Sequence, residues 1–217
     1  MNRYVKYGTL MAIGIVLVAC AQSTPAAQST PTASLPTHTR EPGVRALAID
    51  PRDGRLFKAA SDGLYQSRDG GKSWQNVALP NEIAAKGVSV VALRRDQPDM
   101  IFIAGEEIGI WRGRDAGKTW NKITRGLASE RVSALAVHSN GYPQILRDTS
   151  NSLFAWVDGV GMFESSDAGE TWKRSVDQAL GLDNPHVTAL THTPLDGSMN
   201  TGWLYAATLT GAYLSMD

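Results

Sequence analysis

The segment Ser67-Arg68-Asp69-Gly70-Gly71-Lys72-Ser73-Trp74 recurs along this chain of 217 residues, and its recurrence decides the fold. Related octets occupy residues 113–120 and 165–172, and a fourth begins at residues 215–217. We call these octets the boxes. Their defining residues are Ser67, Asp69, Gly71, Ser73 and Trp74 in the first, Asp115, Gly117, Thr119 and Trp120 in the second, Ser165, Asp167, Gly169, Thr171 and Trp172 in the third, and Ser215 and Asp217 in the fourth.

The sequence between the boxes repeats as well. A glycine, an apolar residue and an aromatic residue precede each box aspartate at a constant offset, as in Gly63-Leu64-Tyr65. Farther upstream each unit opens with an apolar stretch, such as residues 132–136, and a further apolar stretch lies between the two. The spacing from one box aspartate to the next is 46, then 52, then 50 residues. Four short strands in a repeat of this length are the signature of a β-propeller blade.

We therefore predict an all-β fold for residues 43–217, an incomplete β-propeller with three full four-stranded blades and a partial fourth. The predicted blades span about residues 44–87, 88–131, 132–186 and 187–217. Propellers close with about 4 to 8 blades. We expect either a fragment of a longer protein, which we favour, or arcs from two chains that complete each other. The open strand edges of an arc also predict self-association.

The boxes resemble the Asp-box, or BNR repeat, of sialidases, sortilin-type ectodomains, xyloglucanase-type glycoside hydrolases and a photosystem II assembly-factor family. That pattern reads Ser-x-Asp-x-Gly-x-Thr-Trp, and here Ser73 stands for the threonine and Gly113 for the serine. The resemblance implies a turn at the blade periphery, away from the binding face. We expect each box aspartate to accept hydrogen bonds from backbone N–H groups and box hydroxyls, and each tryptophan to be buried. These roles are structural rather than catalytic.

The N-terminus reads as a targeting segment. A cationic head is followed by 11 uncharged residues, Thr9–Ala19, too short for a comfortable membrane span but suited to a signal peptide. Leu17-Val18-Ala19-Cys20 resembles the lipobox of bacterial lipoproteins, which implies cleavage after residue 19 and a lipid on Cys20 that anchors the exported chain in a membrane. Residues 20–42 are rich in Ala, Ser, Thr, Pro and Gln and predict a flexible tether.

Composition excludes several functions. The chain has 21 basic and 21 acidic residues, so no general attraction to nucleic acid is expected. A single cysteine rules out disulfides and Cys-x-x-Cys zinc clusters.

Gly71-Lys72-Ser73 lacks the upstream glycine of a phosphate-binding loop, since Gln66 stands there. The four histidines, His38, His138, His186 and His192, lack metal-ligand spacing, and we expect solvated loop positions for those at strand ends. We predict no cofactor and no metal.

The function predicted is a non-catalytic module that binds a polysaccharide or an envelope protein, or assists assembly, at the cell envelope. The alternative is a fragment or relative of a glycoside hydrolase, which needs two convergent carboxylates. The carboxylates outside the boxes include Asp53, Asp62, Asp96, Asp99, Glu106, Glu107, Asp148, Asp158, Asp183 and Asp196. The sialidase resemblance also implies a Phe-Arg-Ile-Pro segment, which is missing at residues 40–45. Tyr142 and Arg147, in the long loop 139–152, are candidate contact residues.

The lipobox resemblance predicts that Cys20 carries a lipid. Cells grown with labelled palmitate should incorporate label into the wild-type chain and none into Cys20→Ser, because the thioether forms on the cysteine sulfur. Gel fluorography of the immunoprecipitated protein measures the label. Equal labelling of the two chains would rule out the lipoprotein interpretation.

Overall fold

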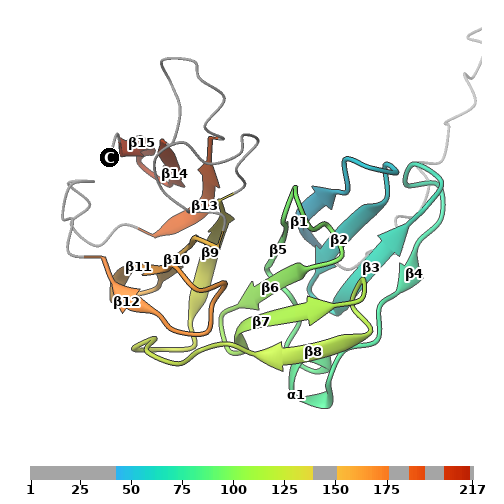
Figure 1. Cartoon of the computed structure of the whole chain (residues 1–217), viewed down its shortest axis with the longest axis horizontal. Coiled ribbons are helices and arrows are strands. Elements are labelled where there is room, and N and C mark those ends of the chain that lie inside the picture. Colours follow the sequence, from blue (N-terminus) through green and yellow to red (C-terminus); the bar gives the residue numbers. More distant parts are fainter. Residues whose placement is uncertain (1–42, 139–150, 176–185, 194–202, 216–217) are drawn as a thin grey trace, which may run out of the picture. The chain divides into compact units, whose positions relative to one another are not determined.

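The computed structural model describes residues 43–138, 151–175, 186–193 and 203–215 (Figure 1). The predicted signal peptide, Cys20, the tether 20–42, the candidate loop residues Tyr142 and Arg147, and Asp217 lie outside the described residues. The same holds for His38, Asp148, Asp183 and Asp196.

The described residues form four small antiparallel sheets, each built from strands that are consecutive in the sequence. The first sheet contains β1 (Val44–Ile49), β2 (Leu56–Ala60), β3 (Gly63–Ser67) and β4 (Gln75–Asn76). The second contains β5 (Val90–Leu93), β6 (Ile101–Gly105), β7 (Gly109–Arg114) and β8 (Thr119–Lys122). The third contains β9 (Val132–Val137), β10 (Leu153–Val157), β11 (Gly161–Ser165) and β12 (Lys173–Arg174). The fourth contains β13 (Val187–His192), β14 (Leu204–Thr208) and β15 (Gly211–Ser215).

These sheets are the blades of a β-propeller, and we number them one to four. The prediction of an all-β propeller with three four-stranded blades and a partial fourth is confirmed. Each sheet runs in an up-and-down order in which every strand pairs with the next one along the chain. Both the loop between the first two strands and the box therefore lie at the same end of each blade.

One short helix was not predicted. The helix α1 (Asn81–Ala84) lies between blades one and two, and its Ile83 is fully buried in the core between these blades. Pro80 precedes the helix with a φ of −54°, which is close to the helical value and suits the start of a helical turn. One turn with a single apolar residue is too short to give a helical periodicity in the sequence.

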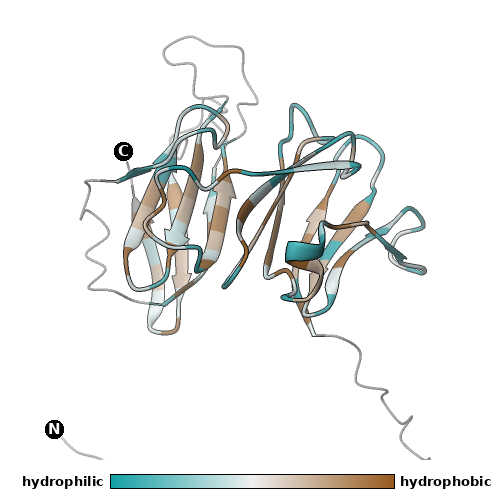
Figure 2. Ribbon diagram, turned by 90° about the horizontal axis from the view of Figure 1, so that it is seen from below, coloured by the Kyte–Doolittle hydropathy of each residue, from teal (hydrophilic) through white to brown (hydrophobic). Residues whose placement is uncertain are grey.

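The core consists of three apolar clusters, one between each pair of consecutive blades. Because side chains alternate along a strand, every blade has two apolar faces. We call the face toward the next blade in the chain the forward face, and the opposite one the rear face. Phe57 and Phe102, on the forward faces of blades one and two, pack in these clusters, as do Val91 and Leu135 on the rear faces of blades two and three. Figure 2 shows the resulting brown bands along the strands.

In the part of the chain that the structure describes, no helix has the length and apolar character needed to cross a membrane.

Two leucines test the contribution of the inter-blade cores. Leu135 is 4% exposed between blades two and three, whereas Leu209, in the turn after β14, is 82% exposed. Leu135→Ala should lower the free energy of unfolding by about 2–5 kcal/mol through lost burial and the cavity that remains. Leu209→Ala should change it by less than about 0.5 kcal/mol. Urea denaturation followed by tryptophan fluorescence measures both, and equal effects would contradict the assignment of Leu135 to the core.

Candidate functional site

The loops that join the first and second strands of the blades begin in the same way. In each, the residue that follows the first strand donates its backbone N–H to the carbonyl just before the second strand. The donor–acceptor pairs are Asp50 to Arg55, Arg94 to Met100, His138 to Ser152 and Thr193 to Trp203. The four donors differ in residue type, yet they occupy equivalent positions at one end of the propeller.

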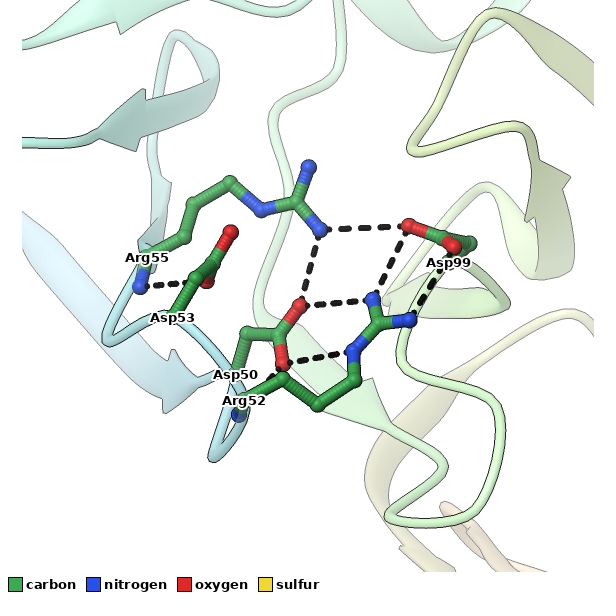
Figure 3. A network of polar contacts seen from close by, with 5 residues as sticks. All are labelled: Asp50, Arg52, Asp53, Arg55 and Asp99. Carbon is green, nitrogen blue, oxygen red and sulfur yellow. Dashed lines mark hydrogen bonds and ion pairs between the residues drawn. The ribbon is translucent and has the colours of Figure 1, made fainter.

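An ion-pair network at this end joins blades one and two (Figure 3). Asp50 is fully buried, and its carboxylate accepts hydrogen bonds from Arg52 Nη2 and Arg55 Nη2, each at 2.9 Å. Both arginines also reach across to Asp99 of blade two, with Arg52 Nη2 at 3.1 Å and Arg55 Nη2 at 3.3 Å from Oδ1. Asp53 Oδ1 accepts the backbone N–H of Arg55, which fixes the loop that carries the two arginines.

The network holds both bridging carboxylates ionised. Hydrogen bonds from the Arg52 side chain, opposed by burial and helped by Arg55, hold the pKa of Asp50 well below its usual range. The same Arg52 side chain lowers the pKa of Asp99, and Asp50 in turn raises the pKa of Arg52. A buried charge of this kind is tolerable only because it is paired on several sides. The two aspartates are therefore permanent acceptors near neutral pH rather than proton donors.

Equivalent polar contacts link the later blades. Arg94 of blade two donates to Asn151 Oδ1 of blade three at 2.8 Å. His138 of blade three contacts His192 of blade four, with 3.2 Å between Nδ1 and Nε2 and 4.2 Å between ring centroids. His138 is 3% exposed, so the expectation of a solvated loop position is wrong for it. Among the described residues, a polar contact at or beside the loop between the first and second strands thus links the blades at each junction.

The first and third boxes form the closed hydrogen-bond ring expected of the pattern. In the first, Ser67 Oγ donates to Asp69 Oδ1 at 2.7 Å and accepts the N–H of Gly71 at 2.8 Å. The Asp69 carboxylate then accepts both the N–H of Ser73, at 2.9 Å, and its hydroxyl, at 2.6 Å. The third box repeats every one of these contacts through Ser165, Asp167, Gly169 and Thr171.

The second box is built differently. Gly113 replaces the serine, and a Cβ at this position would lie 2.8 Å from the ring of Trp120, which occupies the space instead. Without the serine hydroxyl the ring of hydrogen bonds does not form, and Asp115 accepts none from any described residue. Asp115 has a φ of 52°, in the left-handed region. The expectation that Asp115 serves the turn as the other box aspartates do is therefore wrong.

Asp115 instead lines an open pocket of about 340 Å³ at the junction of blades one and two. Its lining comprises Arg52, Asp96, Gln97, Asp99, Met100, Arg114 and Asp115. The N–H of Ala116 donates to the carbonyl of Asp99 and so holds the second box against the loop of blade two. Arg114 and Asp115 are both exposed, and neither side chain bonds to another described residue.

The pocket offers paired charges of both signs to a polar ligand. Arg114 and Asp115 face it with unused donors and acceptors, while Arg52 and Asp99 are held in place by the network. Such an arrangement suits a hydroxyl-rich or zwitterionic ligand, since it provides fixed hydrogen-bond donors and acceptors side by side. Among the described residues no three histidine, cysteine or acidic side chains are placed to hold a metal ion.

The other carboxylates considered for hydrolysis are dispersed. Asp96 pairs with Arg94, Asp62 accepts the hydroxyl of Tyr65 at 2.7 Å, and Asp158 accepts that of Ser133 at 2.9 Å. Glu106 and Glu107 lie in the turn between β6 and β7. Among the members of that set that the structure describes, Asp96 and Asp99 line the pocket, together with the box residue Asp115. Sequence reasoning missed Arg52, Arg55 and Gln97, which belong to loops whose residue types do not repeat, and it missed Arg114, which lies at the end of β7 within the second box.

Comparison with known proteins supports the fold. A family model for the DUF6242 β-propeller domain matches residues 44–123, which cover blade one and nearly all of blade two. No curated protein matches the chain.

Among solved structures, the chain is similar to the GH74 enzyme of Niastella koreensis (TM-score 0.58, 18% identity, 78% of this chain and 26% of that one). It is also similar to an ancestral GH74 enzyme (TM-score 0.55, 18% identity, 76% and 22%). A third similar structure is the extracellular domain of the putative hybrid two-component system BT4673 from B. thetaiotaomicron (TM-score 0.54, 12% identity, 81% and 20%). The chain thus spans about a quarter or less of these proteins, and the likeness shows the fold alone.

The contrast between the boxes predicts unequal effects of one substitution. Asp167→Asn should lower the free energy of unfolding by about 1–3 kcal/mol at neutral pH, because acceptors of the Thr171 and Ser165 groups are lost. Asp115→Asn should change it by less than about 0.5 kcal/mol, since Asp115 accepts no hydrogen bond and asparagine tolerates the left-handed region. Urea denaturation measures both. A loss at Asp115 as large as that at Asp167 would contradict this structure of the second box.

The Asp167 effect should also depend on pH. Burial raises the pKa of Asp167, but hydrogen bonds from Thr171 and Ser165 outweigh it and lower the pKa from 3.8 to about 2. A carboxyl with a depressed folded pKa stabilises the fold above its unfolded pKa and loses this contribution as the pH falls through the folded value. The stability difference between wild type and Asp167→Asn should be full at about pH 5 and shrink between about pH 4 and pH 2.

Proposed function

We propose that the chain is a non-catalytic binding or assembly module, a lipoprotein held at the bacterial cell envelope by a lipid on Cys20. The pocket between blades one and two is its ligand site. The proposal rests on the second box. There Asp115 does not form the hydrogen bonds that the other box aspartates form, and it lines the pocket beside Arg114. A ligand that reaches both residues would contact a carboxylate and a guanidinium that bond to no other described residue.

The charge state of the described carboxylates favours binding over hydrolysis. Glycosidases of both stereochemical classes use a general acid whose pKa is raised, so that it holds a proton at working pH. Where a shift is resolved among the described aspartates, it is downward, as at Asp50, Asp69, Asp99 and Asp167. Asp96, which lines the pocket, is engaged in an ion pair with Arg94.

Backbone strain at the pocket supports a role there. A non-glycine residue in the left-handed region costs about 1–2 kcal/mol, and Asp115 and Ala116 adopt it in succession. In the third box only Ala168 does so before the glycine, and the hydrogen-bond ring around Asp167 offsets the cost. Strained residues with free polar side chains concentrate at binding sites, where the surrounding structure holds them in place.

The resemblance to GH74 enzymes supports one alternative, a relative of the glycoside hydrolases, in which Asp96 and Asp115 would act on a glycosidic bond. A similar fold in the extracellular domain of BT4673 fits an exported module equally well. Because a fold alone does not define an activity, a direct assay must separate binding from turnover.

The proposal predicts binding without turnover. Purified full-length protein is titrated calorimetrically with xyloglucan, mixed-linkage β-glucan, sialyl-lactose and solubilised envelope proteins, and reducing ends are assayed in parallel. The double variant Arg114→Ala/Asp115→Asn should weaken the binding at least about tenfold through lost charge-assisted hydrogen bonds. Lys118→Ala, an exposed change in the same turn but off the pocket, is the matched control and should bind as wild type does.

Two results would overturn the proposal. One is turnover of a polysaccharide that disappears in Asp96→Asn or Asp115→Asn while the melting temperature is unchanged, which would make the chain a hydrolase. The other is binding that the double variant leaves intact, which would place the site elsewhere.

A further inference from the structure

The rear face of blade one is uncovered, although the same face is buried in the blades that follow. Val91 of blade two is 6% exposed and Leu135 of blade three is 4% exposed, because the preceding blade packs on each. Leu47 occupies the equivalent position in blade one and is 63% exposed, and its neighbour Ile49 is 60% exposed. Apolar side chains of a face built for packing therefore lie in solvent.

The box tryptophans show the same difference. Trp120 of blade two donates its indole N–H to the carbonyl of Ala78 in blade one at 3.1 Å. Trp172 of blade three donates to the carbonyl of Ile123 in blade two at 2.7 Å. Trp74 of blade one holds the equivalent position, but its indole N–H bonds to no described residue, and Lys58 Nζ lies 4.6 Å from its ring. Blade one thus presents a tryptophan of the type that elsewhere ties a blade to the one before it.

Blade four exposes the complementary surface. Phe57, Phe102 and Phe154 point from the second strands of blades one to three into the following inter-blade cluster. Tyr205 occupies this forward position in β14, and around it Ala189, Ala207, Ala212 and Leu214 are exposed. The residues of blades one and two that are equivalent to Ala207 and Ala212 are buried against the next blade, and they are Ala59, Leu64, Ala104 and Ile110.

We propose that the rear face of blade one docks against the forward face of blade four in a second copy of this chain. In blades one and two, Ala59 and Val91 meet in one cluster, and in blades two and three Ala104 and Leu135 do so. The equivalent pair at the new junction is Ala207 of one copy and Leu47 of the other. The contact would be one more inter-blade core of the kind already seen.

A second copy fits these faces better than closure within one chain. Both faces are exposed in a single copy, so blade four does not cover blade one there. Two copies joined head to tail bring together eight sheets, which lies within the range of about 4 to 8 blades for closed propellers. Two identical junctions related by a twofold axis would cover these two faces in both copies, whereas an unclosed head-to-tail contact would continue as a filament.

Cross-linking between tagged copies tests the pairing. One copy carries Leu47→Cys and the other Ala207→Cys, with different epitope tags, and both are full-length proteins expressed together and treated in membranes with a short bifunctional maleimide. We expect a product that contains both tags. The control pair, Glu107→Cys with Leu209→Cys, places exposed cysteines in strand-connecting turns off both faces and should give none.

Sedimentation of the purified protein measures the same contact without cysteines. Leu47→Asp buries an unpaired carboxylate at the junction and should raise the dissociation constant of the dimer at least about tenfold. Leu209→Asp makes the same change in an exposed turn and should leave it unchanged. Since Leu47 is exposed in a single copy, the variant should fold, and circular dichroism checks this.

Three outcomes would overturn the proposal. A wild-type protein with the mass of one chain excludes the dimer. A cross-link that forms only when both cysteines lie in the same chain indicates that blade four closes on blade one of its own copy. A dimer that Leu47→Asp leaves intact, with no product containing both tags, indicates a different contact surface.

Discussion

The structure depends on one constraint, which is that a sheet with two apolar faces must be covered on both sides. Strand β6 makes the constraint plain, because all five of its residues are buried. Its Phe102 faces blade three while Ile101 and Ile103 face blade one. A sheet that alternates apolar and polar residues can leave one face in water, but a sheet of this kind cannot. The blades therefore stack by their faces, and the folding of each depends on its neighbours.

Stacking by faces leaves the loop ends of the blades free for polar chemistry. At one end, the residues that follow the first strands all make the same backbone hydrogen bond, and their side chains can vary. Asp50 is linked through Arg52 and Arg55 to Asp99 of the next blade, and Arg94 donates to Asn151 of the blade after it. Arg112 makes a related link through Glu170 and the carbonyl of Ala168. The apolar faces set which blades are neighbours, and these contacts set how the loop ends meet.

Sequence periodicity predicted the strands, because their alternation and the boxes recur at nearly constant spacing. Gly63, the first residue of β3, and Trp172, which directly precedes β12, therefore mark the starts of strands without any knowledge of tertiary contacts. The helix α1 was not predicted because a single turn is too short to show a helical period. Its stability comes from the burial of Ile83 between the neighbouring blades rather than from helix propensity. The arginine network escaped prediction because Arg52 and Arg55 find Asp99 only when blades one and two are packed together.

The second box shows most clearly where residue types no longer predict the hydrogen bonds that a side chain makes. Asp115 stands at the same place in its octet as Asp69 and Asp167, and by type it predicts the same hydrogen-bond ring. The hydrogen-bond ring depends on the residue two positions earlier. There Gly113 supplies no hydroxyl, and the indole of Trp120 fills the space. That indole is itself held by the carbonyl of Ala78 in blade one. The indole that takes the place of the serine side chain in the second box is thus also in contact with blade one.

Further hydrogen bonds couple the candidate pocket to the stacking of the blades. The second box is held to the neighbouring loop by the hydrogen bond from Ala116 to the carbonyl of Asp99, and Asp99 is held to blade one by Arg52 and Arg55. Any change that loosens blade one from blade two therefore displaces Arg52 relative to Asp115. Because the two lie on opposite sides of the junction, a ligand bound to both would stabilise the packing of blades one and two by its binding free energy. Ligand binding and the packing of blade one on blade two are then thermodynamically linked.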